Sequence, residues 1–308
     1  MEEVGSAQQK TLKAAIHCRG MTLHSGTRVG MTLRPAAPDT GIVFRRSDRA
    51  GAEIKACWRN AIEQPLCTRL DDGEGLSVAT IEHLMAALAG LEIDNAVIEI
   101  DGPEVPVMDG SAAPFVFLIE CAGVSEQDAP RRAIRILKQV TVGDGEKSAT
   151  LMPDDGFSMS FEIDFASRAI SRQDLSIVFD SDSFKSEISR ARTFGLLHEV
   201  DRLRAAGLAR GGSLDNSVVV SGDTILNEGG LRYADEFVRH KLLDAVGDLY
   251  LAGGPIIGHF RGERSGHLLN GKLLEALFTT PGACCFTTLS RGDAIDALIW
   301  GERTRATA

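Results

Sequence analysis

Residues 237–248, which read FVRHKLLDAVGD, constrain this chain more than any other segment. The run is apolar except at charged positions, among them His240, Asp244 and Asp248. Because a helix turns once per 3.6 residues, these three side chains lie one above another on one helix face. An imidazole and a carboxylate four residues apart can bind one cation, and such nitrogen and oxygen ligation suits zinc or another borderline divalent metal. Two ligands do not complete a site, so a third must come from elsewhere.

A second segment, residues 77–91, predicts a helix that supplies this ligand. Thr80 is the expected N-cap, and apolar residues follow at helical spacing. Glu82 and His83 fall in the first turn, where the helix dipole favours a carboxylate. With His83 as third ligand, a fourth position stays open for water, which is typical of catalytic rather than structural zinc. Glu82 beside it is a candidate general base.

Each segment alone has a simpler interpretation. A histidine near a helix start is often a cap or a core residue with satisfied hydrogen bonds, and a His/Asp pair four residues apart is often a surface contact. The two segments together favour the metal, because charged groups in apolar surroundings need partners and a cation suits all of them.

The bulk composition excludes several classes of protein. The 308 residues allow two domains, and 44% hydrophobic with 25% charged residues is an ordinary soluble composition. A net charge of −10 argues against a nucleic-acid partner, and no apolar run is long enough for a transmembrane helix. The polar N-terminus resembles neither a signal nor a transit peptide, so we expect a cytoplasmic protein. The six cysteines form no C-x-x-C pair, and Cys67 is either a site-lining residue or a small buried one.

The order of predicted elements is similar in the two halves of the chain. Each half runs through strands, then a helix that carries a histidine, then a strand, so we interpret it as two similar α+β domains that meet at the metal. Residues 125–132 are polar, contain proline and are expected to be a linker. The other predicted helices cover residues 112–122, 182–189 and 197–207, and the predicted strands include 95–100, 134–142, 149–152, 159–165 and 218–220.

Several short stretches occur together in a fixed order from about Thr11 to Leu274. They are 80–91 (TIEHLMAALAGL), 93–95 (IDN), 106–115 (PVMDGSAAPF), 189–195 (SRARTFG), 211–213 (GGS), 236–248 (EFVRHKLLDAVGD) and 265–270 (SGHLLN). With this combination the chain resembles the UDP-3-O-acyl-N-acetylglucosamine deacetylases, which are zinc enzymes of bacterial lipid A synthesis. No expected catalytic position departs from the family pattern.

The resemblance implies an α+β fold of two similar domains. Each would be a small mixed or antiparallel sheet with two helices, the helices packed between the sheets, and each would carry an insert. We expect the domains at residues 1–126 and 133–308. The second insert, near 193–220, would form an apolar passage for a fatty acyl chain, although a purely structural helix would look the same in sequence.

The resemblance also implies roles for single residues. The metal would lie on His83, His240 and Asp244, with Glu82 as base and His267 as a second catalytic histidine. Alone, His267 would be taken for a surface histidine in a loop-like stretch. Three further residues complete the expected catalytic set. Asp248 would keep His267 cationic, and the Thr193 hydroxyl would help His267 to stabilise an oxyanion. Lys241 would bind substrate oxygen or phosphate, unless it is a surface lysine.

The implied reaction removes the N-acetyl group of a UDP-linked, 3-O-acylated glucosamine. The expected cofactor is one Zn²⁺, with Fe²⁺ also possible, and the expected partner is this acylated UDP-sugar, bound by a monomer. Phe165, Arg239 and Arg264 are candidates for the nucleotide end. Two alternatives stay open: another zinc amidohydrolase acting on a peptide or a different N-acyl sugar, and a non-catalytic protein in which Cys67 closes a structural metal site.

Overall fold

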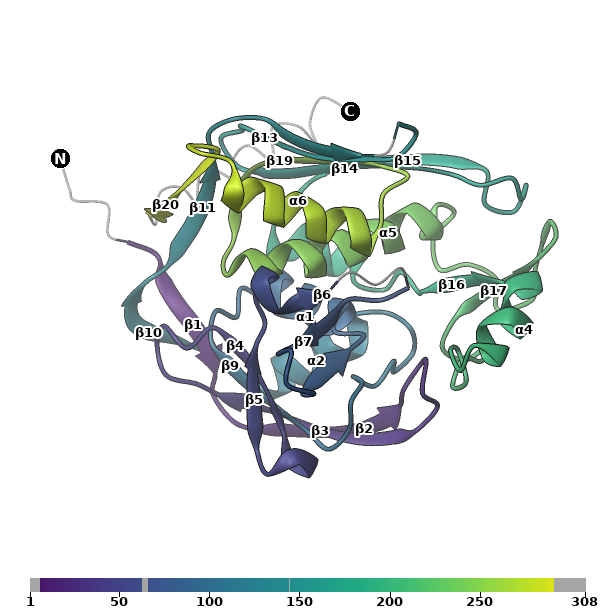
Figure 1. Cartoon of the computed structure of the whole chain (residues 1–308), viewed down its shortest axis with the longest axis horizontal. Coiled ribbons are helices and arrows are strands. Elements are labelled where there is room, and N and C mark those ends of the chain that lie inside the picture. Colours follow the sequence, from purple (N-terminus) through teal and green to yellow (C-terminus); the bar gives the residue numbers. More distant parts are fainter. Residues whose placement is uncertain (1–5, 63–65, 144, 291–308) are drawn as a thin grey trace.

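Two main sheets form the outer layers of the protein, and the long helices lie between them (Figure 1). The computed structural model describes residues 6–62, 66–143 and 145–290. The predicted α+β class with helices between the sheets is confirmed. None of the described helices is long and apolar enough to cross a membrane. The predicted domain ends at residues 1 and 308 lie outside the described residues, and the division into 1–126 and 133–308 stays a prediction.

The first half of the chain builds a five-stranded sheet in the order β2-β3-β9-β4-β5. Its pairs are antiparallel except that β4 runs parallel to β9. Alternate residues of β9 are fully buried, as expected for a strand with one face on the core. The bounds in this half are β2 Ile16–Met21, β3 Arg28–Pro35, β4 Ile42–Arg46, β5 Ala52–Lys55, β6 Ala61–Ile62, β7 Arg69–Asp71, β8 Ser77–Ala79, α1 Glu82–Gly90, β9 Ala96–Ile100 and α2 Ala113–Ala122.

The second half builds a seven-stranded mixed sheet around one long strand, β19. This strand runs parallel to β11 and β14 and antiparallel to β13. The region predicted as one strand over 134–142 is two strands, β11 and β12, which lie at different places in this sheet. The bounds in this half are β11 Arg132–Ile136, β12 Val140–Gly143, β13 Ser148–Met152, β14 Phe157–Asp164, β15 Arg172–Val178, α5 Glu236–Leu249, β19 Ile256–Glu263, α6 His267–Thr279 and β20 Cys284–Thr288.

The stretch predicted as a linker, residues 125–132, is instead mostly strand. It belongs to β10 (Val124–Pro130), which pairs antiparallel with β1 (Gln8–Leu12) near the start of the chain. Its polar residues and proline suit a strand in a two-stranded ribbon, because much of such a strand faces solvent. The connection between the halves is therefore tied down by backbone hydrogen bonds.

The predicted insert near 193–220 forms a small unit at one side of the layers (Figure 1). Strand β16 (Phe194–Leu196) pairs parallel with β17 (Val218–Ser221), and helix α4 (Leu197–Ala205) connects them. A short strand, β18 (Thr224–Ile225), completes this sheet. The predicted helical segment over 182–189 is a short helix, α3 (Ser181–Ser183), continued by a π-helical turn, η3 (Phe184–Ile188).

Helices α1 and α5 pack directly against each other in the middle of the molecule. Gly247 of α5 makes this possible, since a Cβ there would lie 2.0 Å from the carbonyl oxygen of Glu82. Both helices are buried almost all round because layers of protein cover them on two sides. Their close approach brings the first turn of α1 to the metal face of α5.

Helix α1 begins at Glu82 and not at residue 77, and Thr80 is not its N-cap. Residues 77–79 form strand β8, and the chain turns into the helix at Thr80, whose φ is +56°. The Thr80 hydroxyl donates to Glu104 Oε1 at 3.2 Å, so it is used in tertiary contact rather than in capping. The helical periodicity was right, but nothing in it marks where a strand gives way to a helix.

Candidate metal centre and its surroundings

His83 from α1 and the pair His240 and Asp244 from α5 meet in one buried cluster. One possible ligand atom from each lies within 4.8 Å of the other two. Asp244 Oδ1 lies 3.6 Å from His83 Nε2 and 3.3 Å from His240 Nε2. Within the described part of the chain, this oxygen is buried and makes no hydrogen bond. A buried acceptor without a donor, facing two imidazole nitrogens, fits a divalent cation.

The protein fixes which nitrogen of His240 faces the cluster. The Nδ1 lies 3.0 Å from the carbonyl oxygen of Ala191, which can only accept a hydrogen bond. Nδ1 therefore carries the proton, and the unprotonated Nε2 keeps a lone pair that can bind a metal. Burial lowers the pKa of His240 to about 4, which keeps the ring neutral. Neutral imidazole with a defined tautomer is the form that ligates metals.

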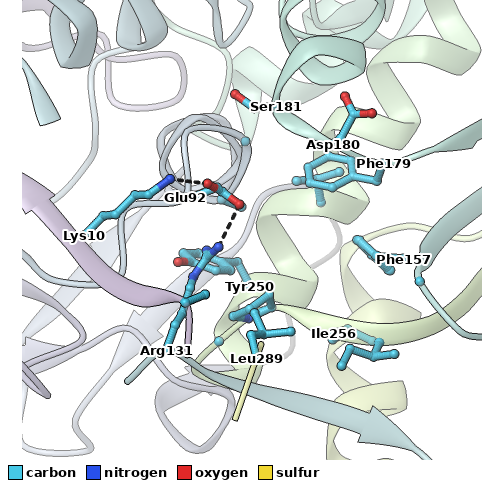
Figure 2. A pocket seen from close by; sticks show the side chains of 18 of the residues that line it. Lys10, Glu92, Arg131, Phe157, Phe179, Asp180, Ser181, Tyr250, Ile256 and Leu289 are labelled. Carbon is cyan, nitrogen blue, oxygen red and sulfur yellow. Dashed lines mark hydrogen bonds and ion pairs between the residues drawn. The ribbon is translucent and has the colours of Figure 1, made fainter. Parts of the chain in front are cut away.

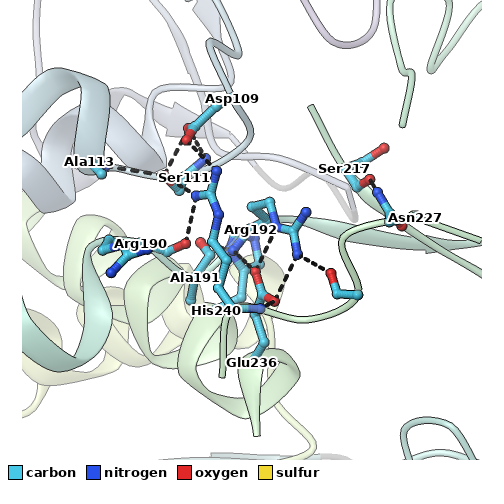
Figure 3. Close-up of polar contacts among 12 residues, drawn as sticks. Asp109, Ser111, Ala113, Arg190, Ala191, Arg192, Ser217, Asn227, Glu236 and His240 are labelled. Atoms are coloured by element: carbon cyan, nitrogen blue, oxygen red, sulfur yellow. Dashed lines mark hydrogen bonds and ion pairs between the residues drawn. The ribbon is translucent and has the colours of Figure 1, made fainter. Parts of the chain in front are cut away.

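A buried ion pair holds the segment that supplies this carbonyl. Arg192 donates from its backbone nitrogen and its Nε to Glu236 Oε1 at 3.0 and 2.8 Å (Figure 3). Glu236 lies one helix turn before His240, so Ala191 is tied to the same helix that carries the ligand. The histidine and the partner that orients it therefore keep their relative positions.

Lys241 supplies a positive charge on the other side of Asp244. Its Nζ donates to Asp244 Oδ2 at 2.7 Å. Burial alone lowers the pKa of Lys241, but the Asp244 carboxylate outweighs this and holds it above its usual value. Burial likewise raises the pKa of Asp244, yet the side chains of His240, Lys241 and His267 hold it well below its usual range. Asp244 is thus an ionised carboxylate with one oxygen paired and one open.

Glu82 is a buried carboxyl group beside the cluster. Its Oε2 accepts a hydrogen bond of 2.9 Å from the backbone nitrogen of Thr68. Burial raises the pKa of Glu82 above its usual value. A carboxylate with a raised pKa next to a metal cluster has the character of a general base.

His267 faces the cluster from a third helix, with Asp248 behind it. Its Nδ1 lies 2.9 Å from Asp248 Oδ2, and its Nε2 lies 3.9 Å from Asp244 Oδ2. Burial alone lowers the pKa of His267, but Asp248 and Asp244 together raise it to about 9. The ring is therefore an imidazolium at neutral pH. The prediction of a flexible loop here is wrong, because His267 is the first residue of α6 and is largely buried.

Three residues that sequence reasoning did not select support these groups. Thr68 contacts both Glu82 and Asp248, and Asn270 Nδ2 donates to Asp248 Oδ2 at 2.8 Å. Ala191 acts through its carbonyl alone. Asn270, three residues after His267 on α6, could have been found from the helical spacing, whereas nothing in the sequence marks Thr68 or a backbone carbonyl.

The expected catalytic residue Thr193, and Cys67, which only the structural-metal alternative required, are not in the cluster. Thr193 is held through its backbone by Gly110 and Val218, and no described contact joins its hydroxyl to the cluster, so its catalytic role stays a prediction. Cys67 is buried, and burial raises the pKa of its thiol to about 12, so it is a protonated thiol. Cys67 is not a member of the metal group found among the described residues.

The candidates for the nucleotide end have partners within the chain. Arg239 donates to Asp235 Oδ1 at 2.6 Å, and Arg264 donates to Asp164 Oδ2 at 2.8 Å. The ring of Phe165 packs edge-on against another phenylalanine at 5.7 Å between centroids. A nucleotide would have to compete for these groups, and their role stays a prediction.

Comparison with known proteins places this site in a family. Residues 9–279 match the model of the UDP-3-O-acyl N-acetylglycosamine deacetylases. A protein of Acidithiobacillus ferrooxidans named UDP-3-O-acyl-N-acetylglucosamine deacetylase is 54% identical over 96% of this chain and 94% of its own length. Proteins of the same name from Marinobacter nauticus and Pseudomonas entomophila are 54% and 53% identical, over 88% and 90% of this chain and 90% and 92% of theirs. The chain belongs to the UDP-3-O-acyl-N-acetylglucosamine deacetylase family.

Proposed function

We propose that this protein hydrolyses the 2-acetamido group of UDP-3-O-(3-hydroxyacyl)-N-acetylglucosamine, releasing acetate and the free amine, as a step of lipid A biosynthesis. The observation that carries the proposal is the open oxygen of Asp244 facing two imidazole nitrogens, with a buried carboxyl and an imidazolium beside it. The names of the relatives supply the substrate. We also propose that the protein acts as a cytoplasmic monomer, which cell fractionation and gel filtration test.

His83, His240 and Asp244 would hold the metal, and we propose Zn²⁺, with Fe²⁺ as the alternative that the same ligands accept. A bound divalent cation would supply Lewis acidity, which polarises the amide carbonyl and lowers the pKa of water. The neutral ring of His240 and the ionised carboxylate of Asp244 are the protonation states that such binding requires.

Glu82 and His267 divide the proton transfers. The Glu82 carboxylate accepts a proton from the attacking water as the C–O bond forms. The His267 imidazolium stabilises the developing oxyanion and then gives its Nε2 proton to the amine as the C–N bond breaks, because an amine leaves poorly without a proton. Asp248 contacts Nδ1 from behind and favours the cationic ring between turnovers.

Thr193 and Lys241 would act on the substrate oxygens. The Thr193 hydroxyl would add a donor to the oxyanion, and Lys241 would bind a sugar or phosphate oxygen. Among the described contacts, Lys241 makes one hydrogen bond, to Asp244. Two of its three donor hydrogens are therefore available to a substrate.

The unit around α4 would bind the fatty acyl chain. Leu197, Leu214 and Leu226 in or next to it are large apolar side chains that are each more than a third exposed. Apolar side chains gathered on one small unit favour an apolar ligand. Phe165, Arg239 and Arg264 would contribute to the nucleotide end.

Acetate release from UDP-3-O-(3-hydroxyacyl)-N-acetylglucosamine, with metal content measured on the same sample, tests the proposal. We expect release that stops on chelation and returns with about one zinc per chain. The nucleotide sugar without its 3-O-acyl chain serves as the control substrate. Equal turnover of that control would favour a different amidohydrolase, and no release from a folded, metal-loaded sample would refute the substrate assignment.

A further inference from the structure

Thr68 contacts both the proposed base and the proposed acid pair. Its backbone nitrogen donates to Glu82 Oε2 at 2.9 Å. Its hydroxyl donates to Asp248 Oδ1 and lies 3.2 Å from His267 Nδ1. Thr68 itself is buried. One residue thus joins two groups that come from different helices.

The directions of these hydrogen bonds follow from the chemistry of the groups. A carboxylate only accepts, so the single hydroxyl hydrogen of Thr68 points to Asp248 Oδ1. The Nδ1 hydrogen of His267 is donated to Asp248 Oδ2 at 2.9 Å, and the Thr68 hydroxyl oxygen lies 3.2 Å from the same nitrogen with its lone pairs free to share that hydrogen. Asn270 also donates to Oδ2, so without the Thr68 hydroxyl Oδ1 would be the unpaired oxygen. A hydrogen bond to a charged, buried group is among the stronger ones.

A cavity of about 190 Å³ lies next to this arrangement. Thr68, Asp248 and His267 line it, together with apolar and basic side chains that include Trp58 and Lys272. A cavity of this size holds several waters. The Thr68 hydroxyl therefore occupies a place at which an exchanging water could otherwise bind Asp248, and it offers a partner with a fixed position.

We propose that Thr68 is a positioning residue for the proposed deacetylation. Its backbone N–H fixes the Glu82 carboxylate, and its hydroxyl fixes Asp248 and through it the imidazolium of His267. The inference rests on the proposed function for its effect on turnover, but the effect on the imidazole itself does not depend on the substrate.

Substitutions at Thr68 separate the hydroxyl from the backbone contact, because every variant keeps the N–H. Thr68→Val replaces the hydroxyl by a methyl group of similar size, and we expect kcat to fall about 10- to 100-fold with metal content and KM near wild type. Thr68→Ser should restore most of kcat. The kcat of Thr68→Ala should lie between those of the valine and serine variants, because water from the cavity can reach Asp248.

Thr150→Val is the matched control for a buried threonine. Thr150 lies in β13, its hydroxyl contacts Thr141 at 3.0 Å, and it is as buried as Thr68. We expect wild-type kcat from this variant and a comparable change in the urea midpoint. If Thr150→Val lost as much turnover as Thr68→Val, the loss would reflect a buried valine and not the position of Thr68.

Two further measurements decide whether Thr68 acts through Asp248. In an Asp248→Asn background, Thr68→Val should lower kcat little further, because the hydrogen bond between the Thr68 hydroxyl and residue 248 is already altered there. The Nδ1 proton resonance of His267, identified by its loss in His267→Gln, should move in Thr68→Val and stay in Thr150→Val. Full additivity, a serine variant as slow as the valine variant, or an unmoved resonance would each overturn the inference. An inactive wild type with a moved resonance would refute the proposed function alone.

Discussion

The two ends of helix α1 carry two clusters of charged residues that differ in whether every carboxylate oxygen has a donor. At its start, Glu82 and His83 join the metal cluster, in which Asp244 Oδ1 has no donor. Just beyond its end, Glu92 and Asp94 form a second cluster with cations from the β1 and β10 region. The first cluster is almost completely buried, whereas the second is partly exposed, with the Glu92 side chain 38% exposed.

The second cluster leaves no carboxylate oxygen open. Arg131 donates to Glu92 Oε1 at 2.8 Å (Figure 2). It also donates to Asp94 Oδ1 at 2.8 Å. Lys10 contacts Glu92 Oε2 through Nζ and Asp94 Oδ2 through its backbone nitrogen. The cavity of about 430 Å³ beside it is lined by Lys10, Glu92 and Arg131, by apolar side chains, and by other charged side chains such as Arg135 and Asp180. We therefore interpret this cluster as a clamp between β1, β10 and α1, although its cavity is the larger one.

In this protein, an unsatisfied carboxylate oxygen therefore identifies the candidate functional site better than cavity size does. In the second cluster every carboxylate oxygen already has a donor, whereas an open carboxylate oxygen among imidazole nitrogens needs a cation. Substitutions in the two clusters should accordingly fail in different ways.

The largest effect is expected at the open oxygen. Asp244→Ala should lower metal affinity by at least about 100-fold and reduce turnover by roughly 10⁴-fold, since the cluster loses its charged ligand. Metal content after dialysis and acetate release measure the two effects. Metal content equal to wild type in both Asp244→Ala and His83→Ala would contradict the ligand assignment.

Removing the base should separate turnover from metal binding. Glu82→Gln keeps the size of the side chain and the hydrogen bond from Thr68, and we expect turnover to fall about 10²- to 10⁴-fold with metal retained. Metal analysis and kcat on one sample provide the check. Loss of the metal in this variant would mean that Glu82 is a ligand rather than a base.

The second cluster should respond in stability and not in chemistry. Arg131→Met removes the main cation of the largely buried Asp94, whereas Glu92 is 38% exposed and keeps Lys10. We therefore expect a loss of about 1–2 kcal/mol in the free energy of unfolding. The urea midpoint reports this loss, while kcat per bound metal should match wild type. A large fall in kcat with an unchanged midpoint would break the contrast between the clusters.

The smallest effect is expected on the pH profile. Since the pKa of His267 is raised to about 9, activity should persist below that pH and fall as the imidazolium deprotonates above it. Asp248→Asn removes the nearest negative charge, so the alkaline limb of kcat/KM should move to lower pH by roughly one unit or more. An alkaline limb at the same pH in both proteins would exclude His267 as the titrating group.

Helical spacing was sufficient to predict that His240 and Asp244 lie on one helix face, because i, i+4 geometry needs no tertiary information. His83 lies on a second helix, and only the combination of the two segments indicated it. His267 came only from the resemblance, because it lies on a third helix whose approach no local pattern encodes. Thr68 was missed for the same reason, since its hydroxyl meets a carboxylate 180 residues away. The linker prediction failed because the pairing of β10 with β1 also joins segments that are far apart in sequence.

Gly247 allows α1 and α5 to touch, and this has a consequence for how the protein matures. His83 belongs to one half of the chain, and the other two proposed ligands belong to the other half. The proposed ligand set is therefore complete only when the halves have docked. Capture of a divalent cation therefore reports the last stage of assembly, so metal uptake during refolding should lag behind the formation of the individual helices. Metal binding therefore depends on correct docking of the two halves, and a misassembled chain would remain without metal and inactive.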